Sequence, residues 1–118
     1  YQKSAVPLPQ LMEYHSKLQK LISEKQIHLD SSLSLDRVSE LLRIPNHHTS
    51  QLFNIVLNES FNAYISTLRV QHSCELLKDE QQMSIDDVAF KSGFGSKASF
   101  NRVFKNLKGC TPSQYRKG

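Results

Sequence analysis

Four polar side chains in and around the stretch GFGSKASFNRVFK, residues 93–105, have the types and the spacing of groups that bind a polyanion. They lie mostly three or four residues apart and would share one face of a helix: Lys97, Asn101, Arg102 and Lys105. The apolar positions would form the opposite, buried face: Phe100, Val103, Phe104 and Leu107. A guanidinium matches the O6 and N7 acceptors of guanine, and an asparagine amide matches adenine. The plain alternative is a solvated polar face without a ligand.

The basic residues are concentrated at the end of the chain. The 118 residues carry a net charge of +4, yet residues 1–87 contain eight Lys and Arg against eleven Asp and Glu, whereas residues 88–118 contain seven Lys and Arg and no acid. A solvated basic tail would explain this sign but not the phenylalanines spaced among the cations. The distribution favours a polyanionic partner. We expect Lys97, Lys105 and the Arg116–Lys117 end to contact phosphates.

Hydrophobic periodicity predicts an all-α fold of about seven helices. The expected helices span residues 10–27, 35–42, 46–57, 61–78 and 85–92, a segment that begins after Ser96, and a last turn near residues 113–117. Ser84, with Asp87 three residues later, predicts a capping box. Cys74 and Cys110 are expected to be reduced thiols, because a helical chain of this kind has no need of a disulfide framework. These elements would position the polar side chains above.

An internal repeat relates two parts of the chain. The sequence SLDRV at residues 34–38 returns as SIDDV at residues 84–88, an offset of 50 residues, and a short helix, a break and a second helix follow in both places. The second copy has one extra residue in its turn. A short helix, a tight turn and a helix with a polar face form the helix-turn-helix unit, whose second helix enters the DNA major groove. Helical hairpins are also common in proteins that bind no DNA.

The helix expected at residues 61–78 would join the two repeats. It is apolar on two opposite sides, so each repeat could pack against one of them. Its length is about 25 Å. Two second helices held by it could read successive major-groove faces of DNA, which lie roughly 34 Å apart.

Several motifs resemble those of the AraC/XylS family of bacterial transcription regulators. They are YISTLR at residues 64–69 with Leu76-Leu77, IDDVA at 85–89, Gly93-Phe94, FNRVFK at 100–105 and TPSQYR at 111–116. The resemblance implies an AraC-type DNA-binding domain over residues 31–118. Its lobes would span residues 33–57 and 84–117, with the linker helix between them. Residues 1–30 resemble the linker and extra helix that precede this domain in larger regulators.

The resemblance also implies which residues meet DNA. The base-contacting positions of the family fall on His47, Ser50 and Gln51 in the first lobe and on Lys97, Asn101 and Arg102 in the second lobe. The phosphate-contacting positions fall on Asn46, Asn54, Ser96 and Lys105. The chain departs from the usual family residues at Pro45, Thr49 and Gly95, and Asn46 could supply the helix cap that Pro45 lacks. The second helix of the first lobe has no Lys or Arg, so we expect it to add selectivity more than affinity.

Other readings of these residues are weaker. Adjacent His47 and His48 would point about 100° apart on a helix, which does not suit chelation of one metal ion. Asp86 and Asp87 lie in the first turn of a helix, where carboxylates suit the helix dipole. Arg69 fits a buried ion pair better than a DNA contact. No nucleophile and base pair, metal set or phosphate loop supports an enzyme, and no cofactor is expected. A protein-interaction module with a basic face stays open as an alternative.

The sequence also suggests a setting for the domain. The chain begins at Tyr1 and its first ten residues contain two prolines, so we expect a part of a longer protein. No apolar run reaches the roughly 20 residues that span a bilayer. We expect a cytoplasmic domain that binds double-stranded DNA, is joined to an N-terminal sensor or membrane-anchored region, and can meet RNA polymerase. Oligomers would form through that region.

Overall fold

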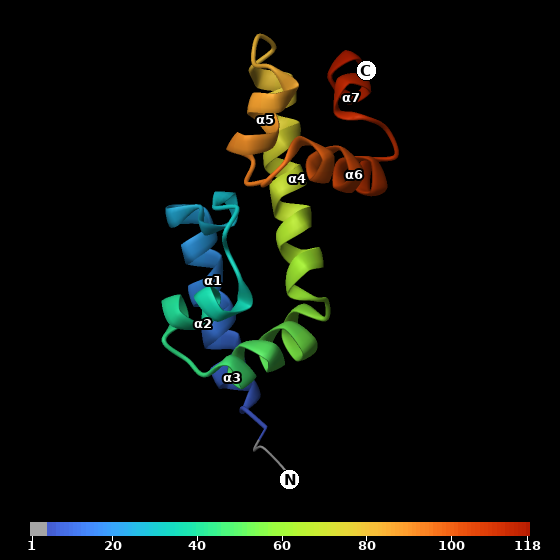
Figure 1. Cartoon of the computed structure of the whole chain (residues 1–118). Coiled ribbons are helices and arrows are strands. Elements are labelled where there is room, and N and C mark those ends of the chain that lie inside the picture. The colour runs from blue at the N-terminus through green and yellow to red at the C-terminus, as the bar shows by residue number, and fades with distance from the viewer. Residues whose placement is uncertain (1–4) are drawn as a thin grey trace. The chain divides into compact units, whose positions relative to one another are not determined.

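The computed structural model describes residues 5–118, and every regular element in that range is helical, as the periodicity predicts. In chain order the elements are α1 (Leu8–Lys25), the 3₁₀ turn η1 (Ile27–Leu29), α2 (Leu35–Leu42), α3 (Asn46–Gln51), η2 (Leu52–Leu57), α4 (Phe61–Asp79), α5 (Ile85–Lys91), α6 (Lys97–Lys108) and α7 (Pro112–Lys117) (Figure 1). No helix of the described residues is long and apolar enough to cross a membrane. Both cysteines are free thiols.

The helix expected at residues 46–57 is not uniform. It is α-helical only over α3 and continues as η2, a π-helical segment. The segment ends at Asn58, which adopts a left-handed conformation with φ of 54°. A π-helical turn places side chains at a different angular spacing from an α-helix, so periodicity counted at 3.6 residues per turn misplaces residues beyond Gln51.

The chain forms two compact units. Unit 1 contains Leu33–Tyr64 together with α1, and unit 2 contains His28–Ser32 and Ile65–Gly118. The short segment between α1 and α2 therefore belongs with the second half of the chain. Helix α4 begins in unit 1 and continues through unit 2.

The sequence repeat is also a repeat of backbone structure. Ser34 Oγ accepts a hydrogen bond from the Arg37 N–H, and 50 residues later Ser84 Oγ accepts one from the Asp87 N–H. Both turns then pass through a left-handed residue, Arg43 with φ of 60° and Gly93 with φ of 92°. The closing bonds repeat as well: the N–H groups of Ile44 and Phe94 donate to the carbonyls of Ser39 and Ala89. Each unit thus contains one helix-turn-helix, α2–α3 and α5–α6.

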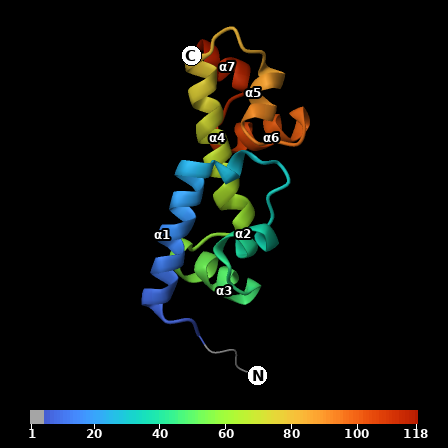
Figure 2. The same cartoon turned by 90° about the vertical axis from the view of Figure 1, so that its left-hand side faces the viewer.

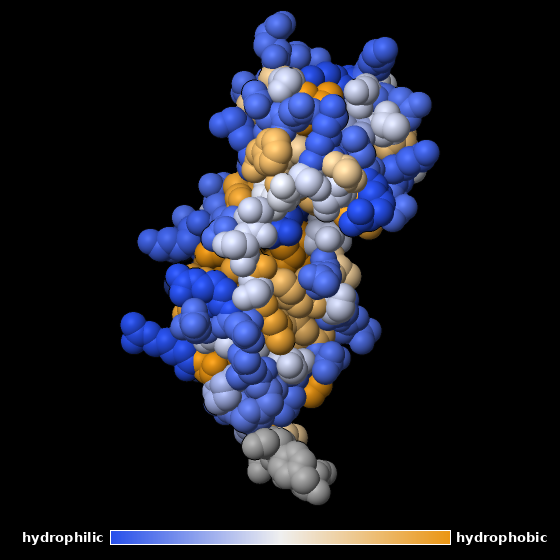
Figure 3. All heavy atoms as spheres, viewed as in Figure 1, coloured by the Kyte–Doolittle hydropathy of each residue, from blue (hydrophilic) through white to orange (hydrophobic). Residues whose placement is uncertain are grey.

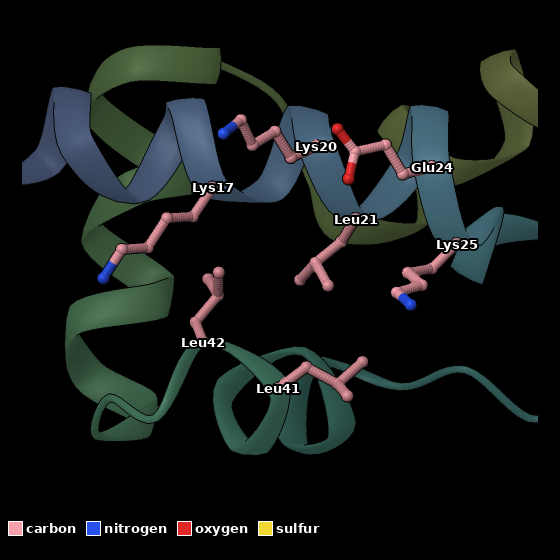
Figure 4. A pocket seen from close by; sticks show the side chains of 7 residues that line it. All are labelled: Lys17, Lys20, Leu21, Glu24, Lys25, Leu41 and Leu42. Atoms are coloured by element: carbon pink, nitrogen blue, oxygen red, sulfur yellow. The ribbon is translucent and has the colours of Figure 1, made fainter.

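Helix α1 docks within unit 1. It lies against α2 and η2 (Figures 1 and 2). Its apolar side buries Leu11, Tyr14 and Leu18. One turn further along, a groove of about 220 Å³ separates α1 from α2. Leu21 of α1 and Leu41 and Leu42 of α2 point into it, and Lys17 and Lys25 lie toward its ends (Figure 4). Leu21 and Leu41 are consequently only half-buried.

We expect two leucines of α1 to differ sharply in their contribution to stability. Leu18 is fully buried, so Leu18→Ala should lower the free energy of unfolding by about 2–5 kcal/mol. Leu21 faces the open groove, so its truncation creates little new cavity. Leu21→Ala should therefore lower the free energy of unfolding by only roughly 1 kcal/mol. Urea unfolding of the two variants measures both values. Equal losses would show that the groove is closed in solution.

The core of unit 2 forms around the aromatic residues of α6 and of the turn before it. Phe94, Phe100 and Phe104 are buried against residues from α4 and α5: Val70, Cys74, Leu77, Val88 and Ala89. The rings of Phe94 and Phe100 lie 5.1 Å apart between centroids, and those of Phe100 and Phe104 lie 5.6 Å apart. The expectation that Leu107 completes this buried face is wrong, because its side chain is 48% exposed. The spacing of Leu107 in the sequence predicts the side of α6 on which it lies. It does not predict whether another element packs against that side at this turn.

A close approach of two backbone segments and the Arg69 side chain holds the turn between α5 and α6. Arg69 donates from Nε to the carbonyl of His28 at 2.7 Å and from Nη2 to the carbonyl of Asp30 at 2.9 Å. The Arg69 side chain thus binds main-chain carbonyls, where an ion pair was expected. Gly93 packs beside this cluster, and a Cβ atom there would lie 2.6 Å from the His28 carbonyl oxygen and 2.9 Å from Arg69 Nε. Burial lowers the pKa of His28, and nearby His72 and Arg69 lower it further.

Two glycines, two positions apart, provide a matched test of this approach. Gly93→Ala should destabilise the protein by about 2–5 kcal/mol, from the left-handed backbone and the clash together. A Cβ atom at Gly95 would meet nothing within 4 Å, so Gly95→Ala should be neutral or stabilising by up to about 1 kcal/mol. Thermal melts of both variants check the difference. A tolerated Gly93→Ala would contradict the close approach.

Candidate nucleic-acid interface

The second helix of unit 2 presents a polar face above an apolar one. Ser96 caps α6 by accepting a hydrogen bond from the Ser99 N–H. Phe100 and Phe104 anchor the helix in the core at 0% exposure, and the polar side chains predicted from the sequence are all exposed: Lys97, Asn101, Arg102 and Lys105. These four residues line one hollow of about 570 Å³ together with Ile85, Thr111, Pro112 and Ser113. The structure therefore brings the four predicted residues together on one concave surface.

The charge of this surface is predominantly positive. The hollow contains three cations and no carboxylate among its lining residues. Hydrophilic residues make up most of unit 2 on the face in view, in the upper part of Figure 3. A surface with several amine and guanidinium donors and one carboxamide can bind phosphate oxygens and the acceptor edges of bases.

The first residue of each second helix is held by an aspartate of the preceding helix. Lys97 Nζ forms an ion pair with Asp86 Oδ1 at 3.2 Å. In unit 1, Asn46 Nδ2 donates to Asp36 Oδ1 at 2.8 Å. Asp36 and Asp86 are 50 residues apart, so the repeat itself carried a signal for this pair of contacts. The sequence interpretation, which related Asp86 only to the helix dipole, missed it.

Asn46 does not cap α3. The N-cap position is Pro45, without a side-chain hydrogen bond, and the Asn46 amide is engaged with Asp36. The unusual Thr49 is fully buried, and its hydroxyl lies 2.6 Å from the Ser39 hydroxyl. This bond joins α2 to α3 inside the helix-turn-helix and compensates for the polar group in the core.

The polar face of α3 is partly held by the N-terminal segment. His47, Asn46 and Asn54 are exposed, whereas Ser50 and Gln51 are half-buried. The Val6 N–H donates to Gln51 Oε1 at 2.8 Å, and the Tyr14 hydroxyl lies 3.1 Å from His48 Nδ1. Nothing in the sequence indicated either contact.

The last basic residues differ in role. Arg116 donates to three main-chain carbonyls, those of Leu77, Glu80 and Met83, at 2.7–3.0 Å. Its guanidinium therefore ties α7 to the end of α4, contrary to the expectation that it faces phosphates. Lys117 is exposed. Thr111 and Gln114 form a full capping box that starts α7.

The arrangement of His, Cys, Asp and Glu side chains bears on whether the described residues could bind a metal ion. No group of three or more His, Cys, Asp or Glu side chains is arranged to hold an ion within residues 5–118. The His47 and His48 rings meet edge to face, with centroids 4.6 Å apart.

Comparison with known proteins places this geometry in a family. The helix-turn-helix domain family matches residues 38–118, which is more than half of the chain. The chain belongs to the AraC-type helix-turn-helix family. Its fold and family are those of DNA-binding transcription regulators and not those of enzymes.

Relatives and solved structures agree with this assignment. An HTH-type transcriptional regulator of Staphylococcus aureus is 34% identical over 111 residues, which cover 87% of this chain and 15% of the relative. The chain thus spans about 15% of the length of the relatives it matches. The C-terminal domain of the response regulator yesN from Fusobacterium nucleatum has a TM-score of 0.78 at 25% identity, covering 88% of this chain and 98% of that one. The C-terminal domain of AraT from Geobacillus stearothermophilus has a TM-score of 0.75 at 25% identity, covering 91% and 83%.

The ion pair of this AraC-type domain leads to a prediction for DNA affinity. Asp86→Asn should free Lys97 and raise the affinity for any duplex about 1.5- to 5-fold, the range expected for an exposed ion pair. Asp87→Asn removes the same charge from the same first turn of α5, so it controls for the general effect of charge and should give a smaller gain. Fluorescence anisotropy at low salt measures both. Equal gains would contradict a specific effect on Lys97.

Proposed function

We propose that this chain is the sequence-specific output domain of a larger transcription regulator. Its two second helices, α3 with η2 and α6, would enter adjacent major grooves of one duplex. One observation carries the proposal: on α6 an exposed face of three cations and an asparagine lies directly above a fully buried aromatic face. A rigid helix that presents donors in this way is what direct readout of base edges requires.

Within this proposal the residues of unit 2 supply most of the affinity. Arg102 is suited to guanine, because its planar fork matches the O6 and N7 acceptors, and Asn101 is suited to adenine. Lys97 would reach a base edge after leaving Asp86. Lys105 and the Ser96 region at the start of α6 would contact phosphates.

The residues of unit 1 would add selectivity. His47, Ser50 and Gln51 would reach base edges, and Asn46 and Asn54 would contact phosphates. The repeat supports two of these residues, because Ser50 and Gln51 lie 51 residues before Asn101 and Arg102. Helix α3 and η2 contain no Lys or Arg, so their contacts would be hydrogen bonds between neutral groups.

The setting proposed for the domain follows from its relatives. Those relatives are HTH-type transcriptional regulators about seven times longer than the matched region, which supports a sensor or membrane-anchored region elsewhere in the whole protein. Contact with RNA polymerase in the cytoplasm, and oligomers formed through the other region, are part of the same proposal.

The decisive experiment separates DNA reading from binding of an acidic protein. The chain should enrich a defined sequence from a pool of random duplexes and bind it roughly 10³-fold or more tightly than bulk DNA. The logarithm of the binding constant should fall linearly with the logarithm of salt concentration. A chain that enriches no sequence from the pool would contradict the proposal, whatever its affinity for bulk DNA.

Two neighbouring side chains should respond in different ways on the enriched sequence. Arg102→Ala should weaken binding to that sequence by about 1–3 kcal/mol, relax preference at one base pair, and leave binding to a scrambled duplex nearly unchanged. Lys105→Ala should weaken binding to both duplexes about equally and reduce the salt slope by roughly one. Titrations at several salt concentrations, with melting temperatures as a check on folding, measure these effects. Equal losses for Arg102→Ala on both duplexes would assign it to a phosphate.

A further inference from the structure

Gln51 is held by a donor from the protein itself. Its Oε1 atom accepts a hydrogen bond of 2.8 Å from the main-chain N–H of Val6, 45 residues earlier. A main-chain N–H can only donate, so the atom that faces Val6 must be the carboxamide oxygen and not its nitrogen. The orientation of this amide group is therefore determined by chemistry, whereas amides in other surroundings can be flipped.

The segment that supplies this donor is itself anchored in unit 1. Val6 is 6% exposed, although its neighbours Ala5 and Pro7 are exposed. Two turns of α1 further on, the Tyr14 hydroxyl bonds to His48, which lies three residues before Gln51 on α3. Residues three apart share a side of a helix, so His48 and Gln51 both meet the N-terminal part of the chain. On α3, Gln51 therefore lies between the side that meets the N-terminal part of the chain and the polar face that includes His47.

The fixed orientation limits what Gln51 can offer to a base. Glutamine reads adenine with both ends of its amide: Nε2 donates to N7 while Oε1 accepts from the N6 amino group. The Val6 N–H occupies one of the two lone pairs of Oε1, whereas the Nε2 group keeps both of its donors. The bond therefore halves the acceptor capacity of this amide and shifts its balance toward donation. Guanine presents two acceptors, O6 and N7, in the major groove, whereas adenine presents one acceptor and one donor.

We propose that the Val6 N–H sets the specificity of Gln51, so that this glutamine reads guanine and disfavours adenine. Val6 is then a positioning residue, and Gln51 imitates a donor-only side chain such as Arg102, its equivalent in the second repeat. The proposal rests on the proposed function, because it requires that α3 lies in a major groove.

The test measures base preference at one position of the enriched duplex. That position is the base pair whose preference disappears in Gln51→Met. The wild-type chain should prefer guanine over adenine there by about 5- to 150-fold, the range for a good base contact. Val6→Pro removes the N–H and should reduce that ratio to about one or below, without a change in affinity for a scrambled duplex. A chain that starts at Pro7 lacks the same donor, so it should show the same loss of preference for guanine. It replaces Val6→Pro if that variant folds poorly.

Two further variants make the interpretation specific. Gln51→Glu keeps an acceptor for Val6 but loses both donors, so its melting temperature should be retained while its preference changes from guanine to cytosine, which offers an amino donor. Arg102→Gln places a glutamine at the equivalent position of α6 without a partner like Val6, and it should accept adenine at its own base pair.

The outcomes distinguish a failure of the role proposed for Val6 from a failure of the proposed function. A wild-type preference for adenine at the Gln51 position, or an unchanged preference in both variants that lack the Val6 donor, would overturn the assignment of Val6 while the proposed function stands. A lower melting temperature with unchanged base preference would likewise show that the bond is structural only. Failure to enrich any duplex would overturn the proposed function and, with it, the role of Gln51.

Discussion

The guanidinium of Arg69 organises the part of unit 2 on which the position of α6 depends. Its bonds to the carbonyls of His28 and Asp30 bring the segment before α2 against the turn before α6, where the contact distance leaves room only for the glycine at position 93. Since Gly93 also has a left-handed backbone, the course of this turn is determined by sterics and hydrogen bonds together. Helix α6 begins four residues later, so the course of this turn determines the direction in which the helix starts.

A second guanidinium performs a similar task on the other side of α6. Arg116 closes the end of α4 by bonding to three carbonyls, and the Tyr115 ring beside it packs on Phe104, with centroids 5.5 Å apart. Charge-assisted bonds to several carbonyls are stronger than bonds between neutral groups, and they satisfy acceptors that a helix end leaves open. Two of the arginines in this region thus hold the scaffold, whereas Arg102 lies exposed on α6.

The features that sequence predicts well are local ones. The serine caps at positions 34 and 84 were predictable because a cap bonds three residues away. The burial of Phe100 and Phe104 and the exposure of Arg102 follow from the angular spacing of one helix. The π-helical segment and the exposed Leu107 were not predictable in the same way, because each depends on what neighbouring elements do at that turn. The bonds of Gln51 to Val6 and of Arg116 to Leu77 join residues 45 and 39 positions apart, and side-chain type alone does not indicate such partners.

The two repeats use one backbone with different electrostatics. At the first position of the second helix, unit 2 pairs a lysine with an aspartate, and unit 1 pairs an asparagine with the equivalent aspartate. At the proposed base-contacting position, unit 2 has an arginine, which can only donate, and unit 1 has a glutamine whose carbonyl oxygen already accepts one bond from the main chain. A cation attracts any phosphate within a Debye length, whereas a neutral amide gains energy only in contact and in one orientation. A helix without cations therefore depends on the orientation of its amides for any discrimination, and in unit 1 the bond from Val6 holds the orientation of the Gln51 amide.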